Sequence, residues 1–247
     1  MTEMENSLEN TIKNNYEQVI ENIAKHALKA GRNPQDVHLV VVSKYQPIES
    51  ILAAFQAGAT RFGENYPEQA LPKIEGLQDY PKLEWHMIGH LQTRKARIIA
   101  DHFTMIHSLD SIHLAEKLNT LLCDRSKTLR ALIEVNVSGE DAKGGWPVWE
   151  KSQWPVFLEE VQPILRMPGL KIEGLMTMPP LMDDAEKTRP YFKRLRALQE
   201  YLMRESDEKY WRDLSIGTSA DYTVAIEEGA RYVRIGQAIL GMRKNIR

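Results

Sequence analysis

The chain has 247 residues and a formal net charge of −2 at neutral pH. This length allows one large α/β domain with a sizeable core, and the near-neutral charge argues against a nucleic-acid partner. The polar N-terminus, the lack of any apolar run of membrane-spanning length and the single cysteine, Cys123, predict a cytoplasmic protein with no signal peptide, membrane partner or internal disulfide.

The first predicted element is a helix from about Glu5 to Ala30. Its hydrophobic residues recur at helical spacing along one face, and Gly31 with Pro34 just beyond it provides a stop signal. Because this helix precedes the first strand, we expect residues 1–31 to pack on the outside of the fold that follows.

Strand-like and helix-like segments then alternate with short connections. The predicted strands are Val37–Ser43, Ala59–Gly63, Leu83–Ile88, Phe103–His107, Ala131–Val137, Lys171–Met176, Asp213–Ile216 and Tyr232–Ile235. The helical patterns between them cover Ile48–Ala57, Glu68–Leu77, Thr93–Ala100, Ile112–Cys123, Val148–Leu165, Thr188–Met203 and Ala220–Glu228. This alternation predicts an α/β protein with a single (β/α)8 TIM-type barrel domain over residues 1–247. A doubly wound open sheet is the alternative, but the glycine-rich dinucleotide turn of that fold does not occur.

A lysine follows the first predicted strand. The aliphatic run in this segment is typical of a strand buried on both faces, and Lys44 stands at its carboxyl end, before Pro47 opens a helix. Burial lowers the pKa of a lysine and leaves a nucleophilic amine, which imine formation with an aldehyde requires. The alternative is a structural lysine whose head group reaches water at the strand end.

Small and hydroxylic residues follow the last two predicted strands. Gly217–Asp221 comes directly before a predicted helix, whose free N–H groups and positive dipole end favour an anion. Gly236 and Gln237 supply a second close backbone approach, and the loops after strands seven and eight commonly bind phosphate in barrels. The alternative is that Ser219 serves only as a helix cap.

These features together indicate pyridoxal 5′-phosphate as a cofactor. Lys44 would form the aldimine (Schiff base), the small-residue turns would hold the phosphate, and Arg234 would face the ring nitrogen. An arginine only donates hydrogen bonds and stays cationic, so it disfavours protonation of that nitrogen and weakens the ring as an electron sink. Such a site favours binding over carbanion chemistry.

At this point the sequence resembles the pyridoxal phosphate homeostasis proteins (the YggS/PROSC family), whose fold is similar to the alanine racemase N-terminal barrel domain. The resemblance extends from about Gly31 to Gly241. It rests on seven motifs in the same order: Val41–Lys44, Phe62–Tyr66, Trp85–Gln92, His107–Asp110, Gly174–Pro180, Leu214–Asp221 and Val233–Gly236.

The resemblance implies a cofactor-binding barrel without strong catalytic activity of its own. It implies these cofactor-binding residues, none of them catalytic: Lys44 for the aldimine, Asn65 and Met176 lining the pocket, Ser219, Gly236 and Gln237 on the phosphate, and Arg234 at the ring nitrogen. The chain departs from the family at Thr218 and Ala220, which flank the matching serine, and at Arg94, which leaves the role of that loop open.

Three further features of the sequence each allow a functional and a structural interpretation. His86 and His90 lie four residues apart, but on a strand and its following loop, and without a complete ligand set we expect no metal site. Glu64 is either a general base or a structural carboxylate paired with a neighbouring basic group, and we favour the second. For Trp146, Trp149 and Trp154 we favour packing against an outer helix over a lid or a partner surface.

The predicted function is therefore intracellular homeostasis of pyridoxal phosphate, as a carrier, buffer or regulator. We expect a monomer whose partners are the cofactor and the apo-forms of enzymes that use it. An amino-acid racemase is the alternative, although it needs a second acid–base group opposite Lys44. A cofactor-free Schiff-base aldolase is a third possibility.

Overall fold

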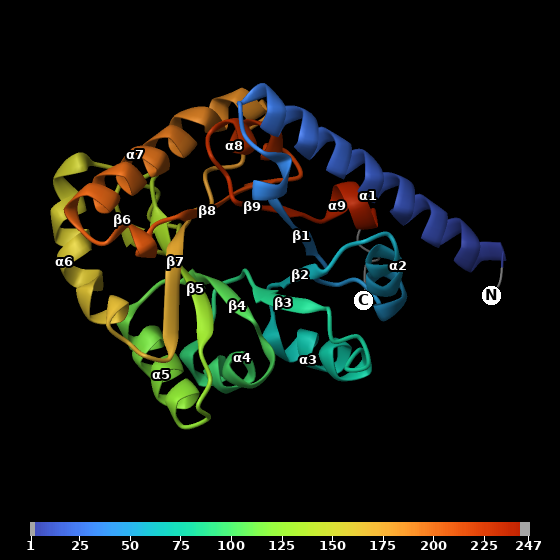
Figure 1. The fold of residues 1–247 in the computed structure, drawn as a ribbon, viewed down its shortest axis with the longest axis horizontal. Helices are drawn as coiled ribbons and strands as arrows, with labels where there is room; N and C mark the ends of the chain where they lie inside the picture. The colour runs from blue at the N-terminus through green and yellow to red at the C-terminus, as the bar shows by residue number, and fades with distance from the viewer. Residues whose placement is uncertain (1–2, 243–247) are drawn as a thin grey trace.

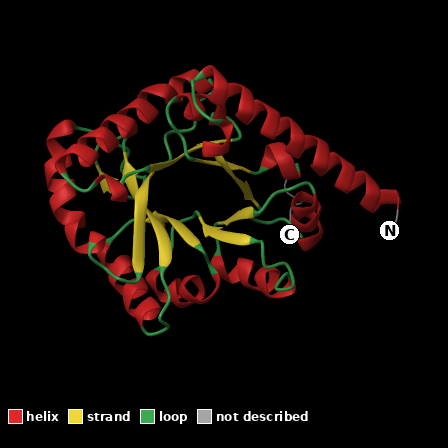
Figure 2. Cartoon of the chain, viewed as in Figure 1, coloured by secondary structure: helices red, strands yellow, loops and turns green. Residues whose placement is uncertain are grey.

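The computed structural model of the chain describes residues 3–242, with side chains from residue 7 onward. Figure 1 shows a ring of strands surrounded by helices, and Figure 2 separates the two kinds of element by colour. Within the described residues, no helix is both long and apolar enough to cross a membrane.

Parallel strands close into a barrel. The barrel strands are β1 (His38–Val42), β2 (Arg61–Glu64), β3 (Glu84–Met87), β4 (Met105–Leu109), β5 (Leu129–Asn136), β7 (Leu170–Met176), β8 (Asp213–Thr218) and β9 (Tyr232–Ile235). Their order is β4-β3-β2-β1-β9-β8-β7-β5, and pairing of β4 with β5 closes the ring. The prediction of a (β/α)8 barrel is therefore confirmed, and the open sheet is excluded.

Helices cover the outside of this ring, as Figure 1 shows. Their bounds are α1 (Glu3–Lys29), α2 (Ile48–Gln56), α3 (Pro67–Gly76), α4 (Ala96–His102), α5 (Ile112–Cys123), α6 (Trp154–Leu165), α7 (Arg189–Glu205), α8 (Tyr222–Glu227) and α9 (Gln237–Leu240). The extra N-terminal helix is α1, and it packs outside the barrel against α2, α8 and α9. A hydrogen bond between His26 and Glu227 and a salt bridge between Lys29 and Glu227 fix its carboxyl end to α8.

The start of helix α6 differs from the expected position for a local reason. Helix α6 begins at Trp154 instead of Val148, because Trp146–Pro147 forms a short strand, β6, beside β5. Next to it, Glu150 and Gln153 form a capping box at a 3-10 turn, and Pro155 lies in the first turn of α6. The short helix α9 was not predicted.

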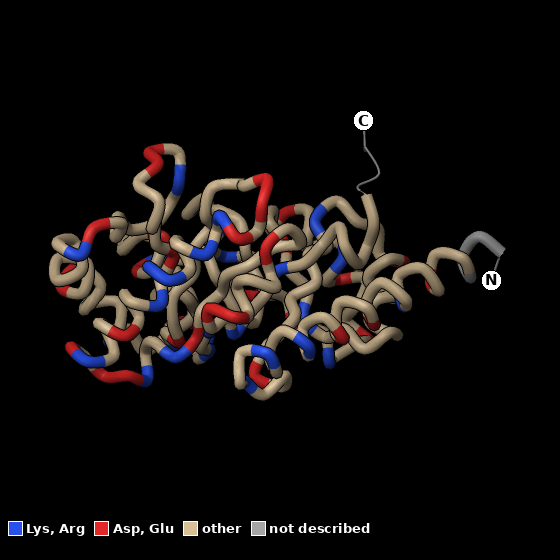
Figure 3. Tube along the Cα trace, turned by 90° about the horizontal axis from the view of Figure 1, so that it is seen from above, with Lys and Arg blue, Asp and Glu red and all other residues tan. Residues whose placement is uncertain are grey.

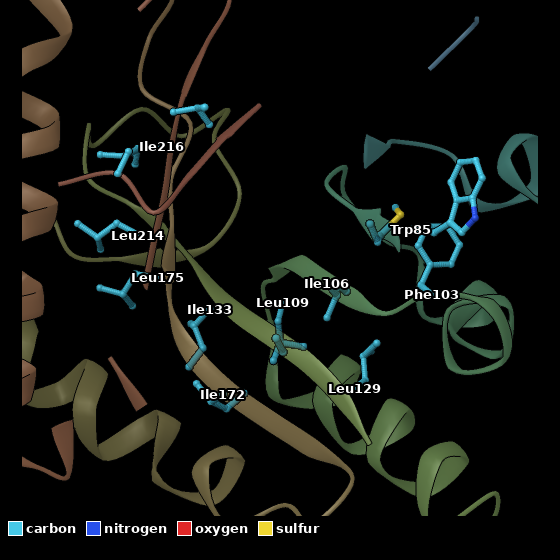
Figure 4. Packing of buried hydrophobic residues seen from close by; sticks show 14 of the residues in the cluster. Trp85, Phe103, Ile106, Leu109, Leu129, Ile133, Ile172, Leu175, Leu214 and Ile216 are labelled. Atoms are coloured by element: carbon cyan, nitrogen blue, oxygen red, sulfur yellow. The ribbon is translucent and has the colours of Figure 1, made fainter. Parts of the chain in front are cut away.

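The hydrophobic core has an outer and an inner part. Most buried apolar side chains pack between the strands and the surrounding helices, as Ile133, Leu175 and Leu214 do in Figure 4. A separate cluster inside the barrel contains Val40, Met105, Leu132, Met176 and Tyr232. Buried histidines, serine and arginine accompany this inner cluster, so the barrel interior is a mixed polar and apolar core.

Candidate functional site

Parallel pairing brings the carboxyl ends of all barrel strands to one face. The register places Val42 beside Gly63, Val41 beside Ile235, and Thr218 beside Arg234. The residues predicted for the cofactor site either lie in the last residues of these strands or come directly after them. We call this end of the barrel the C-terminal face.

Lys44 lies in a turn at the C-terminal face. The strand before it ends at Val42, one residue earlier than expected, so Lys44 follows the strand by two residues. The next residue, Tyr45, has a φ of 61°, a backbone conformation that is costly for an aromatic residue. Its ring lies 5.5 Å from the ring of Tyr66. This packing holds the strained turn that positions half-buried Lys44.

A buried carboxylate lies directly beside this turn. Glu64 ends β2 with a fully buried side chain, and its Oε1 accepts hydrogen bonds from Ser43 Oγ at 2.7 Å and Lys73 Nζ at 2.8 Å. Lys73 also donates to the carbonyl of Ser43 at 2.8 Å. The prediction that Glu64 pairs with a basic group is therefore confirmed. The cluster joins β2 and α3 to the residue before Lys44.

Two buried oxygens at the end of β2 have no hydrogen-bond partner within residues 3–242. They are Oε2 of Glu64 and Oδ1 of Asn65. A side chain at Gly89 would come within 2.8 Å of the Asn65 backbone, so the glycine lets the loops after β2 and β3 approach closely. Buried acceptors without a partner are rare in folded proteins, which makes these two oxygens unusual features of this side of the face.

Arg234 on β9 is the most deeply placed cation of the site. Its side chain donates to Ser215 Oγ, to the Thr177 carbonyl at 3.1 Å, and to Sδ of Met178 at 2.8 Å. Burial lowers its pKa to about 10, so it remains charged at neutral pH. These partners are all neutral, which leaves a buried positive charge facing the C-terminal face without an ion pair among the described residues.

A hydrogen-bonded chain extends from this arginine into the barrel. Ser215 Oγ lies 2.7 Å from Nδ1 of His107, and His107 Nε2 lies 2.9 Å from Nδ1 of His86. Burial lowers the pKa of both imidazoles, and the neighbouring cations lower that of His107 further. Neutral imidazoles can relay hydrogen bonds in either direction, so Arg234 is oriented by groups that carry no charge.

The turns after β8 and β9 contain the predicted phosphate residues. Ser219 is exposed in the turn after β8, and Asp221, not Ser219, is the N-cap of α8. The predicted helix start at Ala220 was therefore wrong, as was the capping role considered for Ser219. Asp221 Oδ1 instead accepts from the backbone N–H and hydroxyl of Thr218 at 2.7 and 2.9 Å, which shapes the turn and leaves Ser219 on the surface.

Gly236 brings the second turn against β1. A side chain there would lie 3.0 Å from the Val42 carbonyl, so glycine lets β9 continue into α9 close beside the Lys44 turn. Gln237 follows as the exposed first residue of α9. Because both α8 and α9 are short, an anion here would depend on Ser219 and on backbone N–H groups more than on a helix dipole.

Two other residues at this face deserve note. Met176 is buried inside the barrel with the inner cluster, opposite Glu134 of β5 in register. Burial and the nearby Asp110 raise the pKa of Glu134 to about 7. The sequence analysis missed Glu134, although its alternation with Leu132 and Asn136 on β5 places it on the inner side of the barrel.

The two histidines considered as a metal pair lie in different surroundings. His86 is buried in the barrel, whereas His90 is exposed and bonds Asp110 at 2.7 Å. Among the side chains that the structure describes, residues 7–242, no group of three His, Cys, Asp or Glu is arranged to hold a metal ion.

The tryptophans pack against outer helices. Trp146 and Trp154 are buried, against Phe157 of α6 and Tyr201 of α7 respectively. Trp154 also donates to the Val148 carbonyl at 3.1 Å. Packing on the outer helices is therefore confirmed for these two residues. Trp149 is partly exposed and covers Gly139.

Sequence comparisons place the chain among known proteins. The model of the family "Alanine racemase, N-terminal domain" matches residues 12–244. Pyridoxal phosphate homeostasis proteins of Vibrio alginolyticus and Aquifex aeolicus are 39% and 40% identical to this chain. The alignments cover 94% and 92% of this chain and 98% and 96% of those proteins.

Solved structures agree with this placement. A protein of unknown function from Bifidobacterium adolescentis superimposes with a TM-score of 0.85 at 31% identity, covering 94% of this chain and 96% of that one. PipY of Synechococcus elongatus, solved with pyridoxal phosphate bound, gives 0.75 at 32% identity, covering 89% and 100%. Alanine racemase of Clostridium difficile shares the fold, with a TM-score of 0.69 at 13% identity over 92% of this chain and 55% of that enzyme. The chain thus belongs to the pyridoxal phosphate homeostasis protein family, with the barrel fold of the alanine racemase N-terminal domain.

Proposed function

We propose that the protein binds pyridoxal phosphate at the C-terminal face of the barrel and serves intracellular homeostasis of this cofactor without appreciable turnover of its own. The observation that carries the proposal is the convergence on one face of Lys44, an exposed Ser219 turn and a buried Arg234 that has no ion pair among the described residues. The relatives named for this role, and PipY with the cofactor bound, support it.

The residues present fit the chemical groups of the cofactor. Lys44 supplies the amine for covalent attachment, while Ser219 and the backbone of Gly236 and Gln237 supply donors for the phosphate oxygens. Asn65, whose buried Oδ1 lacks a partner in the described residues, lines the pocket with Met176. When bound, pyridoxal phosphate supplies an aldehyde for this attachment and a conjugated ring that can withdraw electrons.

Arg234 disfavours catalysis by this site. It would hold the ring nitrogen by donating a hydrogen bond, and its cation opposes a proton on that nitrogen. Ser215 and the neutral His107 keep the guanidinium in place without adding a negative charge. A weaker electron sink lowers the stabilisation of a carbanion, which both racemisation and transamination require.

A racemase is the second candidate, and Glu134 is the observation that favours it. Its pKa of about 7 suits a general acid or base near neutral pH. Arg234 argues against a racemase, because it lies on the same inner surface and favours binding of the cofactor over its use in racemisation. The two functions differ in a measurable quantity, which is the rate of α-proton exchange on a bound amino acid.

The binding step is tested by titrating the apo-protein with pyridoxal phosphate and recording the visible absorbance band of the protein-bound cofactor. Wild-type protein should develop the band, and Lys44→Ala should not, with far-UV circular dichroism unchanged. Lys44→Ala should retain weak non-covalent binding through the phosphate donors. A band of equal strength in Lys44→Ala would exclude this lysine as the attachment point.

The absence of turnover is tested by incubating the loaded protein with single-enantiomer amino acids in deuterium oxide. We expect α-proton exchange far below the typical enzymatic range of about 1–1000 per second. Exchange within that range would establish the racemase candidate, and Glu134→Gln would then show whether Glu134 is the second acid–base group.

A further inference from the structure

A large cavity lies at the opposite end of the barrel from Lys44. Its volume is about 800 Å³, and its wall includes the first residues of several strands, such as His38 of β1, Leu170 of β7 and Asp213 of β8. This N-terminal face normally contributes to stability and not to function in barrels of this type. The cavity is nevertheless within the size range of small-molecule sites.

Positive charge dominates the wall of this cavity. Among the described lining residues, the carboxylates are Glu173 and Asp213. The lining cations are Arg130, Arg166, Lys171, Lys209, Arg212 and Arg231. The chain as a whole has a net charge of −2, and Figure 3 shows basic and acidic segments interspersed along it. The excess is therefore a local property of the cavity.

The neighbouring carboxylates do not neutralise this excess. Glu173 is shared, at 2.8 Å each, between Arg130 and Lys171. Arg166 and Arg212 make no salt bridge with any described residue, although both line the cavity. Two guanidinium groups that line the cavity therefore have no ion-pair partner among the described residues, although Arg212 lies near enough to Asp207 and Asp213 to interact with them electrostatically.

Arg231 adds a buried donor that the protein does not use. Its NH1 pairs with Asp36 at 3.0 Å, but its Nε is buried and has no hydrogen-bond partner in the described part of the chain. The nearest carboxylate, Asp213, lies 3.8 Å from this Nε, too far for a hydrogen bond. An unpaired buried donor costs stability, and the guanidinium of Arg231 adds its positive charge to the wall of the cavity.

The rest of the wall is suited to an organic ligand. Leu165, Met167, Ile172 and the ring of Tyr210 supply apolar and aromatic surface between the cations. The hydroxyl of Tyr232 is bonded by Arg130, which fixes that guanidinium at the inner end of the cavity. Apolar walls with a few convergent charged donors are typical of sites for small charged metabolites.

We propose that this cavity binds a small organic anion with two or more negative charges, carried by phosphate or carboxylate groups. Its recognition elements are Arg166 and Arg212, which line the cavity, are exposed at its entrance and form no salt bridge with a described residue. This site is separate from the cofactor site at the C-terminal face, and the proposal stands whether or not pyridoxal phosphate binds there.

Isothermal titration calorimetry with inorganic pyrophosphate and with citrate tests the proposal. The full-length protein is used with and without saturating pyridoxal phosphate, so that anion binding at the C-terminal face is recognised by its loss when the cofactor is present. The double variant Arg166→Gln/Arg212→Gln removes the entrance charges. Arg204→Gln is the matched control, because Arg204 is an exposed arginine of α7 that pairs with Glu205 outside the cavity.

We expect saturable binding of at least one probe that persists with the cofactor present. The double variant should bind at least about tenfold more weakly, since it loses two charged donors, while Arg204→Gln should match the wild type. Tighter binding of pyrophosphate would identify a phosphate ligand, and tighter binding of citrate a polycarboxylate. No saturable binding of either probe, or equal affinity in the double variant and the wild type, would overturn the proposal.

Discussion

The two ends of the barrel use charge in different ways. At the C-terminal face, Glu64 and Lys73 form an ion pair in which the carboxylate is fully buried, and Arg234 is buried among neutral partners. At the N-terminal face, long lysine and arginine side chains surround an open cavity, and pairs such as Lys209 with Asp207 are half exposed to water. At the C-terminal face, the charged side chains are buried and held by contacts within the protein. At the N-terminal face, they are open to solvent and can contact a ligand.

This difference determines how each end should respond to substitution. Buried charges depend on their partners for stability, because water cannot replace a lost contact. Exposed charges are solvated and contribute little to folding. We therefore expect the C-terminal face to combine cofactor binding with stability. Substitution of the exposed cations at the N-terminal face should affect binding with little effect on stability.

The largest expected effect is that of Lys73→Met. It leaves the buried Glu64 carboxylate without its cation, which should lower the free energy of unfolding by about 3–5 kcal/mol. Urea denaturation measures this loss. Lys209→Met at the N-terminal face is the matched control and should change stability by less than about 1 kcal/mol. The double variant Lys73→Met/Glu64→Gln should recover part of the loss. Equal losses of stability for Lys73→Met and Lys209→Met would contradict the difference between the two faces.

Ser219→Ala should act on binding alone. It removes one hydrogen bond to a charged phosphate, about 1.5–3 kcal/mol, and should weaken pyridoxal phosphate binding roughly ten- to a hundredfold. Binding of pyridoxal, which lacks the phosphate, should be unchanged, and so should stability, because Ser219 is exposed. Titration of the apo-protein with both compounds measures this. Equal losses for the two compounds would remove Ser219 from the phosphate site.

A smaller, pH-dependent effect is expected at the N-terminal face. Burial, followed by Arg61, Arg231 and Arg130, lowers the pKa of His38 to about 4, whereas an unfolded histidine titrates near ~6.5. Below pH ~6.5 the imidazole of His38 is protonated in the unfolded chain but stays neutral in the folded protein. Protonation therefore favours unfolding. The stability that the neutral imidazole allows is complete above pH ~6.5 and is lost as the pH falls towards 4.

The variant His38→Phe should therefore flatten the dependence of unfolding free energy on pH between about 6.5 and 4. Phenylalanine preserves the ring packing against Tyr232, which lies 5.3 Å from His38. His113→Gln, at an exposed position of α5, should leave the slope as in the wild type. An unchanged slope in His38→Phe would show that this imidazole does not contribute to the acid sensitivity of the fold.

The barrel and most of its C-terminal face could be predicted because their signals are local. Buried strands are continuous apolar runs, and β9 has the bounds expected from the sequence. The residues that follow such strands must meet at one face, which placed Lys44, Ser219 and Gly236 together. The start of α6 was missed because the capping box at Glu150 competes with the apolar pattern before it.

Contacts between distant segments could not be predicted in this way. A serine on β8 and a histidine on β4 read as isolated polar residues, and only the closed barrel brings Ser215 and His107 within 2.7 Å. The basic cavity has the same origin. Arg130, Arg166 and Arg212 come from separate segments of the chain. No short stretch of the sequence is therefore basic enough to predict the positive charge of the cavity.

The central claim is that the C-terminal face holds pyridoxal phosphate on Lys44. Its most direct test is to load the protein with the cofactor, reduce the complex with sodium borohydride and map the modified peptide by mass spectrometry. The account predicts one pyridoxyl group on Lys44, and none at that peptide in Lys44→Ala. Stoichiometric modification of a different lysine, such as Lys73 or Lys143, with Lys44 unmodified would contradict it.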